Sequence, residues 1–190
     1  MEETLWLLLK VLAVGVLVFL NGFFVAAEFA LVKVRETQLT GMVAAGNRRA
    51  LMARRLVGNL DSYLSACQLG ITLASLGLGW IGEPIFEALL TPLYDLHLSG
   101  GDPWLAAKSP WRTWISFGVG FTVITFLHIT AGEQAPKWLA IKKPLPTSLW
   151  TAYPLRWFYI LMYPFIHGLN RCALWMLRSV GMETKNDEGH

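Results

Sequence analysis

The residues of this chain that could do chemistry are oxygen-bearing side chains set within long apolar stretches. Asn21 and Glu28 lie seven residues apart in the first stretch, two turns apart on about the same face of a helix. Placing a polar side chain inside a membrane costs free energy, so each of these residues needs a structural or functional explanation. Asn21 could make a hydrogen bond between helices, which is common in membrane bundles. Glu28 could pair with Lys33 or Arg35 as readily as serve as a ligand.

A second group of polar side chains forms a stripe in the next apolar stretch. Its members are spaced three, four and three residues apart and lie on one helical face: Ser65, Gln68, Thr72 and Ser75. Such a stripe is either a polar seam between helices or the wall of a hydrated cavity, and we favour the cavity. In the third stretch, Thr130 could line the same pathway. His128 is interpreted as a hydrogen-bonded histidine of the bundle, because no second His or Cys stands at a ligand spacing.

The sharpest local feature is the sequence Gly132-Glu133-Gln134-Ala135-Pro136-Lys137. Pro136 cannot donate a backbone hydrogen bond and Gly132 bends freely, so we expect the helix to break there. Carbonyls freed at membrane depth are tolerated only where they line a cavity or a site. With Glu133 beside them, they could form a cation site of oxygen ligands. The alternative is a helix C-terminus at which Lys137 balances Glu133.

The oxygens of Asn, Ser, Thr, Glu and the backbone are hard ligands. They suit Mg²⁺, Ca²⁺ or Na⁺ rather than copper or zinc. The sequence contains no HExxH, GxSxG, P-loop or kinase signature. Its hydroxyls are spread out and lack an activating base. We therefore expect no enzyme activity, no catalytic residues and no organic cofactor.

The composition indicates what kind of protein must position these groups. Of the 190 residues, 54% are hydrophobic and 15% are charged. A soluble domain usually carries about 25% charged residues. A chain this apolar could hardly cover its own surface with polar groups, which disfavours a soluble enzyme, a nucleic-acid-binding protein and a disordered tail. We therefore expect an integral membrane protein whose surroundings are lipid.

Three apolar stretches are long enough to cross a membrane, for which a helix needs about 20 residues. They cover residues 5–32, 64–90 and 111–131. The expected fold is an all-α integral membrane domain over residues 1–183, with three transmembrane helices per subunit.

Two further segments are expected to be amphipathic helices lying at the cytoplasmic interface of the membrane. Residues 33–60 mix basic side chains with apolar ones at roughly helical spacing, broken at Gly46-Asn47, which indicates one or two short helices. Residues 148–181 are apolar and rich in aromatic side chains, but prolines interrupt them. We expect a pair of helices there, with a fourth span as the second choice. Residues 184–190 are a polar tail.

The basic residues predict the orientation. The first linker has a single acidic residue, Glu36, against six basic ones: Lys33, Arg35, Arg48, Arg49, Arg54 and Arg55. More lysines follow the third span, whereas the segment after the second span is acidic. The positive-inside rule places the basic segments in the cytoplasm. We therefore expect a multi-pass protein of the plasma membrane with its N-terminus outside and its C-terminus in the cytoplasm.

Three motifs in this order resemble a known family. Asn21-Gly22-Phe23-Phe24-Val25-Ala26-Ala27-Glu28-Phe29-Ala30-Leu31 is similar to its first-span signature, and Gln68-Leu69-Gly70-Ile71-Thr72-Leu73-Ala74-Ser75 to its second. The Gly132–Lys137 sequence is similar to its Gly-Glu-x-x-Pro-Lys element. Together they resemble the transmembrane domain of the CorC and CNNM magnesium transporters, over nearly the whole chain.

The resemblance implies a metal site formed by Asn21, Ser75, Gly132 and Glu133. Thr72 and Gln68 are close alternatives to Ser75, where relatives carry Asn. Val25 stands where relatives show serine, so one oxygen has to come from a backbone carbonyl or from water. Glu28, Ser65, Gln68, Thr72 and Thr130 are additional candidates for the ion pathway.

The resemblance further implies a homodimer that exports largely dehydrated Mg²⁺, with Na⁺ as the coupling ion. Members of the family continue into cytoplasmic CBS domains, which bind ATP, and we expect these in the full-length protein. The alternative is a membrane-anchored sensor or scaffold for divalent cations that transports nothing.

Overall fold

The computed structural model describes residues 2–97 and 110–179, and these form helices joined by short connections. The elements are α1 (Glu2–Lys33), α2 (Glu36–Ala44), α3 (Arg48–Val57), α4 (Leu60–His97), α5 (Pro110–Leu127), the π-helix η1 (His128–Gln134), α6 (Ala135–Lys142) and α7 (Pro144–Ser179). No strand occurs in the described ranges. The expectation of an all-α fold is confirmed for this part of the chain, whereas the polar tail over 184–190 lies outside it.

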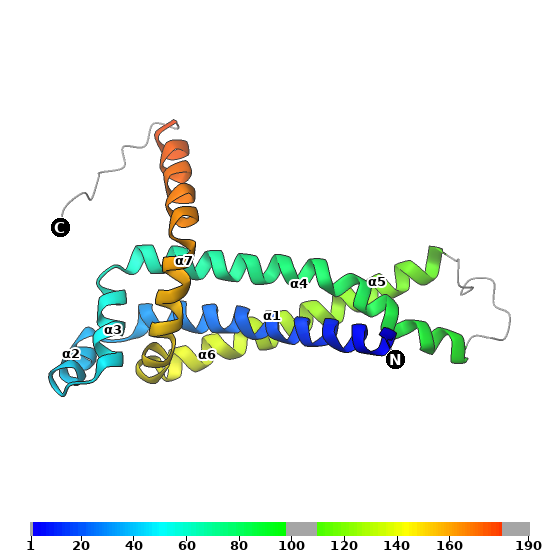
Figure 1. Cartoon of the computed structure of the whole chain (residues 1–190), viewed down its shortest axis with the longest axis horizontal. Coiled ribbons are helices and arrows are strands. Elements are labelled where there is room, and N and C mark those ends of the chain that lie inside the picture. Colours follow the sequence, from blue (N-terminus) through cyan, green and yellow to red (C-terminus); the bar gives the residue numbers. More distant parts are fainter. Residues whose placement is uncertain (1, 98–109, 180–190) are drawn as a thin grey trace.

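Two long antiparallel helices, α1 and α4, form the centre of the molecule (Figure 1). They pack closely because Gly70 on α4 leaves room for the Phe24 ring, which lies 2.5 Å from where a Cβ would stand. Within the described residues, two helical segments are long and apolar enough to cross a membrane, Leu5–Lys33 and Leu60–Ile81. The third expected span is helical, as α5 and η1, but is not one of these two.

The third long element is one continuous helical path through α5, η1 and α6. It starts beside α4, crosses α1 and continues along the other side of α1 as α6 (Figure 1). The expectation that the helix would break at Gly132 and Pro136 is therefore wrong, because the chain remains helical through both residues. The π-helix η1 ends at Gln134, and α6 begins at Ala135, directly before Pro136.

The linker after α1 contains the two short helices expected there, and they separate at the expected place. Gly46 has φ +83°, a left-handed conformation that favours glycine. The side chain of Asn47 then caps α3 by accepting hydrogen bonds from the backbone N–H groups of Arg49 and Ala50, at 2.9 and 3.2 Å. The buried residues of α3 are Ala50, Ala53 and Leu56, which leaves most of its arginine side chains at the surface.

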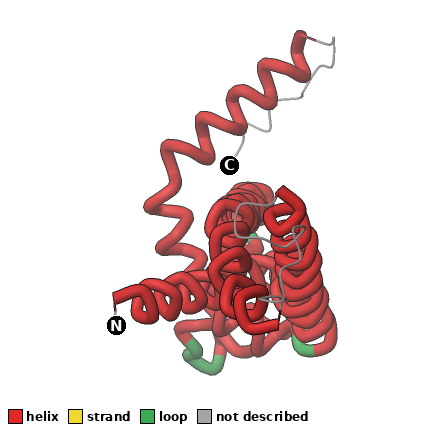
Figure 2. Tube along the Cα trace, turned by 90° about the vertical axis from the view of Figure 1, so that its right-hand side faces the viewer, coloured by secondary structure: helices red, strands yellow, loops and turns green. Residues whose placement is uncertain are grey.

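The aromatic segment is one helix, α7, rather than the expected pair, and it contains both Pro154 and Pro164. Each proline removes one backbone hydrogen bond. Buried residues on both sides of the prolines, among them Thr151 and Ile166, pack into the protein and hold the helix together. The helix crosses the bundle at a steep angle and then extends away from it (Figures 1 and 2).

Aromatic side chains attach α7 to the two central helices. Phe158 lies 4.6 Å from Phe24 of α1, and Tyr159 lies 4.7 Å from Tyr63 of α4, measured between ring centroids. Tyr63 also shares a hydrogen bond with the Arg156 side chain. These contacts belong to the main buried cluster, so α7 is part of the core near the end of the bundle where α2 and α3 lie.

Candidate functional site

Asn21 makes a buried hydrogen bond to the third long element. Its side chain is 2% exposed, and Nδ2 donates to the carbonyl oxygen of Gly132 at 2.9 Å. In an α-helix that carbonyl would accept from the backbone N–H four residues later, but Pro136 occupies this position and has no N–H. The sequence therefore frees the carbonyl, and Asn21 satisfies it.

The π-helical geometry makes room for this contact. The N–H of Ala135 bonds to the carbonyl of Thr130, five residues back, which is the π-type pattern. Gly132 is buried, and a Cβ added there would lie 3.2 Å from both Asn21 Nδ2 and His128 Cδ2. A larger residue would push against the polar contact. Such π-type bulges occur frequently at functional sites.

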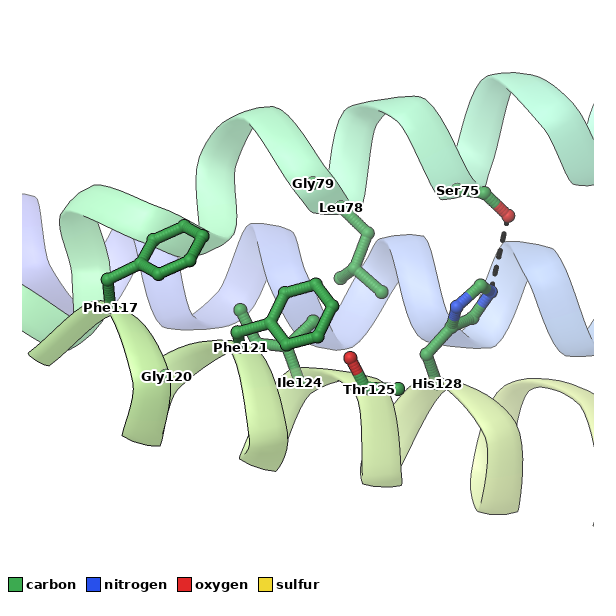
Figure 3. Close-up of a pocket in the computed structure, with 9 residues that line it drawn as sticks. All are labelled: Ser75, Leu78, Gly79, Phe117, Gly120, Phe121, Ile124, Thr125 and His128. Atoms are coloured by element: carbon green, nitrogen blue, oxygen red, sulfur yellow. Dashed lines mark hydrogen bonds between the residues drawn. The ribbon is translucent and has the colours of Figure 1, made fainter. Parts of the chain in front are cut away.

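Ser75 of α4 links Asn21 to a histidine. Its Oγ donates to Asn21 Oδ1 at 3.3 Å and lies 3.2 Å from His128 Nε2, the contact drawn in Figure 3. A serine hydroxyl has one hydrogen, so with that hydrogen on Asn21 the histidine must donate to Ser75 through Nε2–H. Asn21, Ser75, His128 and the Gly132 carbonyl thus form one continuous chain of hydrogen bonds, which we call the Asn21 network.

His128 belongs to this network although it was interpreted as a bundle histidine outside the site. It is hydrogen-bonded, as expected, but its partner is a candidate ligand. One signal was available in the sequence: His128 lies four residues before Gly132, on the same side of a helix. The residue that His128 would meet could not be known without the placement of η1 relative to α4.

A cavity of about 220 Å³ extends from the network along α4 and α5. Ser75, Thr125 and His128 supply its polar atoms, and Phe117 and Phe121 line it farther along α5 (Figure 3). Its volume would hold several waters, each of which takes about 30 Å³ in the liquid. Of the polar stripe, Ser75 lines this cavity.

The other members of the stripe do not face that cavity. The hydroxyls of Ser65 and Thr72 donate to carbonyls of their own helix four residues back, at 3.0 and 2.8 Å. Gln68 hydrogen-bonds the carboxylate of Glu28 across the α1–α4 interface. Glu28 therefore pairs with the side-chain amide of Gln68. The expected ion pair of Glu28 with Lys33 or Arg35 does not form in the described part of the chain. Thr130 is exposed.

Glu133 is placed apart from the Asn21 network. It follows Gly132 directly, yet its side chain is exposed, and no side-chain hydrogen bond joins it to the network in the described structure. No ion pair joins Glu133 to Lys137 within the described residues, and the Lys137 ammonium lies over the Phe29 ring, 4.9 Å from its centre. The alternative of a helix C-terminus at this point is wrong, since the helix continues as α6.

The Asn21 network can offer three oxygens to a cation: Asn21 Oδ1, Ser75 Oγ and the Gly132 carbonyl. These neutral oxygens are hard ligands. No group of three or more His, Cys, Asp or Glu side chains that could hold a metal ion occurs in the described part of the chain. The arrangement therefore suits a hard cation bound by amide, hydroxyl and carbonyl oxygens, and not a zinc or copper centre.

Comparison with known proteins places this chain in a family. The family described as "Cyclin M transmembrane N-terminal domain", CNNM, matches residues 12–190. The chain belongs to the CNNM family. The family resemblance carried by the three motifs is thereby confirmed. CNNM domains are membrane domains and not enzymes, which agrees with the two apolar helices of this chain.

The curated relatives of this CNNM domain are longer proteins. The UPF0053 proteins YugS and YhdT of Bacillus subtilis are 45% and 44% identical to it, over 94% and 95% of this chain. A third, YhdP, is 40% identical over 95% of this chain. The chain spans about two fifths of the length of these relatives: 40%, 38% and 39%.

Proposed function

We propose that this CNNM domain is the membrane part of a secondary-active transporter that exports Mg²⁺ across the plasma membrane, coupled to Na⁺. The observation that carries the proposal is the Asn21 network. It gathers hard oxygen donors from three separate helical elements at a depth where polar groups are otherwise costly. The resemblance to magnesium transporters and the membership of the CNNM family support the choice of ion.

In this proposal Mg²⁺ binds by replacing the hydrogen bonds of the Asn21 network. Asn21 Nδ2 satisfies the Gly132 carbonyl, and Ser75 satisfies Asn21 Oδ1. When Mg²⁺ binds, the Asn21 amide turns its oxygen toward Gly132, so that three oxygens face the ion. The hydrogen bonds that are lost are replaced by bonds to the cation.

The remaining ligands come from Glu133 and from water. Mg²⁺ requires six oxygens in near-octahedral geometry at about 2.1 Å. Glu133 supplies the negative charge, and its exposed carboxylate has to turn toward the network when the ion arrives. The π-helical turn that contains Glu133 is the element that would move, because its hydrogen bonding already departs from a regular helix.

The transport pathway in this proposal needs three spans and two copies. The path through α5, η1 and α6 serves as the third span, with the basic linkers in the cytoplasm and the N-terminus outside. α7 lies in the inner interface, where its aromatic side chains meet lipid. A homodimer covers the polar face of α4, and CBS domains of the full-length protein regulate the cycle.

A flux experiment tests the proposal against a sensor that transports nothing. The purified protein is placed in liposomes loaded with a Mg²⁺-sensitive dye, and a Na⁺ gradient is applied. We expect Mg²⁺ to move opposite to the flow of Na⁺, to reverse its direction when the gradient is reversed, and to stop moving in Asn21→Ala. Mg²⁺ binding without any flux in the wild-type protein would instead support the sensor.

A further inference from the structure

Glu28 and Gln68 make a second polar contact between α1 and α4. It has the same arrangement across the two helices as the Asn21–Ser75 contact. Ser75 hydrogen-bonds Asn21, and Gln68 hydrogen-bonds Glu28. Each partner of the second pair lies seven residues from its counterpart, later in α1 and earlier in α4, as two antiparallel helices require. Seven residues are about 10.5 Å along a helix. The two pairs are therefore successive polar layers of one interface.

The two layers differ in how they are covered. Asn21 is 2% exposed, because η1 lies over it with the Gly132 carbonyl. Glu28 is half-buried and Gln68 is exposed.

The path of the third element explains this difference. Beyond Gly132 it crosses α1, so that Pro136 comes to lie against Gly22 and Ala140 packs with Ala26 and Ala30. α6 packs on α1 and α7, while α4 packs on α5, and α4 and α6 diverge toward the end of the bundle that holds α2 and α3 (Figure 1). α7 packs on α1 and α4 at this end, yet Gln68 stays exposed, so the second layer is more open than the first.

The carboxylate of Glu28 has no basic partner within the described structure. Its hydrogen-bond partner is the neutral amide of Gln68. A carboxylate inside a membrane segment usually pairs with a cationic group or marks an ion pathway. Here the pairing group would be a mobile cation, since no Lys or Arg side chain of the described residues takes that place.

We propose that Glu28 and Gln68 hold a divalent cation that keeps part of its water shell, as a loading site on the cytoplasmic side of the Asn21 network. This inference rests on the proposed direction of transport. Two protein oxygens cannot fill six positions, so water occupies the others. Mg²⁺ gives up its water reluctantly. The Glu28–Gln68 layer lies about two helical turns from the Asn21 network. An ion that stops there first would lose its water shell in two steps.

The charge-removing variant Glu28→Gln tests the site in the purified protein in liposomes. Flux is measured while the Mg²⁺ concentration at the cytoplasmic face is varied. We expect the half-saturating concentration to rise about tenfold while the maximal rate changes less than about twofold, which is the pattern of lost uniform binding. The control is Glu36→Gln, which removes an exposed carboxylate at the start of α2 and should change neither value.

The variant Gln68→Glu separates a binding role from a structural hydrogen bond. A second carboxylate in this layer should lower the half-saturating Mg²⁺ concentration by about threefold if the layer binds the ion. If the Glu28–Gln68 contact only holds the helices together, two facing carboxylates would raise that concentration or destabilise the protein without improving binding, and the proposal is overturned. An unchanged half-saturating concentration in Glu28→Gln overturns it as well.

Equilibrium binding tests the loading site independently of transport. If the wild-type protein shows no flux, the proposed function fails, yet Mg²⁺ titration of the protein in detergent can still show two classes of site. Loss of the weaker class alone in Glu28→Gln supports the loading site, and loss of neither overturns it. Na⁺ that competes for the weaker class with the affinity of Mg²⁺ would overturn the assignment to a divalent cation.

Discussion

The side-chain amide of Asn21 donates to the backbone carbonyl of Gly132, 111 positions later in the chain, at 2.9 Å. The bond exists because Pro136 cannot supply the backbone donor that this carbonyl would otherwise have. One polar side chain and one proline, on different helices, thereby create a buried contact at which carbonyl, amide and hydroxyl oxygens meet. The contact organises the candidate site and is also a structural link between α1 and η1.

Asn21→Ala should separate the structural and the ion-binding contributions of this contact. The substitution leaves the Gly132 carbonyl buried without its side-chain donor, and hydrogen bonds between membrane helices contribute about 0.6 kcal/mol on average. We expect the free energy of unfolding in detergent to fall by about 1 kcal/mol and the Mg²⁺-dependent rise in Tm to disappear. Asn21→Asp, which keeps an oxygen and adds charge, should retain Mg²⁺-dependent stabilisation. A normal Mg²⁺ response in Asn21→Ala would exclude Asn21 from the site.

Gly132→Ala tests the space inside the π-helical turn. The added Cβ would lie 3.2 Å from Asn21 Nδ2 and from His128 Cδ2, so one of these groups must shift. We expect the Mg²⁺ concentration for half-maximal stabilisation to rise about tenfold, equivalent to about 1.4 kcal/mol. Gly118→Ala on α5 is the control, because a Cβ there meets nothing within 4 Å. Equal behaviour of the two variants would show that the close packing at Gly132 is unimportant for binding.

Pro136→Ala should weaken Mg²⁺ binding and stabilise the fold. Alanine restores a backbone N–H that can donate to the Gly132 carbonyl, and it removes a proline from a helix interior, where proline costs about 3 kcal/mol. We expect a higher Tm without Mg²⁺ and weaker Mg²⁺ binding, because the carbonyl is then occupied by its own helix. Pro154→Ala in α7 should raise stability without changing Mg²⁺ binding. If Mg²⁺ binding in Pro136→Ala stays at the wild-type level, the freed carbonyl is not a ligand.

Gly70→Ala tests the close approach of α1 and α4. The new Cβ would lie 2.5 Å from the Phe24 ring, which is itself packed between Phe23 and Phe158 at centroid distances of 5.2 and 4.6 Å. Overpacking of this kind costs about 1–3 kcal/mol. We expect a clear loss of thermal stability, measured by unfolding in detergent. Gly79→Ala on the same helix meets open space and should be neutral. Similar stability of both variants would mean that α1 and α4 adjust freely at Phe24.

Part of the candidate site was implied by the family resemblance. Asn21, Ser75, Gly132 and Glu133 were expected at one site, and the structure brings the first three together and leaves Glu133 exposed. The break at Gly46-Asn47 was predictable from the local sequence, as glycine adopts positive φ and Asn47 caps the next helix. That break depends on a few neighbouring residues.

Other features depend on how each helix is rotated about its axis and could not be predicted. His128 reaches Ser75, and Glu28 reaches Gln68, only because η1 and α1 turn these faces toward α4. The exposure of Glu133, one residue from the buried Gly132, follows from the same rotation. The prolines of α7 likewise read as a division into two helices, whereas packing of residues on both sides keeps one helix.

The sequence by itself determined the helical, membrane-embedded character of the chain, because that character follows from the sum of its apolar side chains. It also determined that the Gly132 carbonyl would lack its usual donor, since proline carries no N–H. The tertiary structure alone decided which side chain satisfies that carbonyl and how the chain passes the proline. Those outcomes depend on contacts between helices distant in sequence, and the close packing that glycine permits sets them.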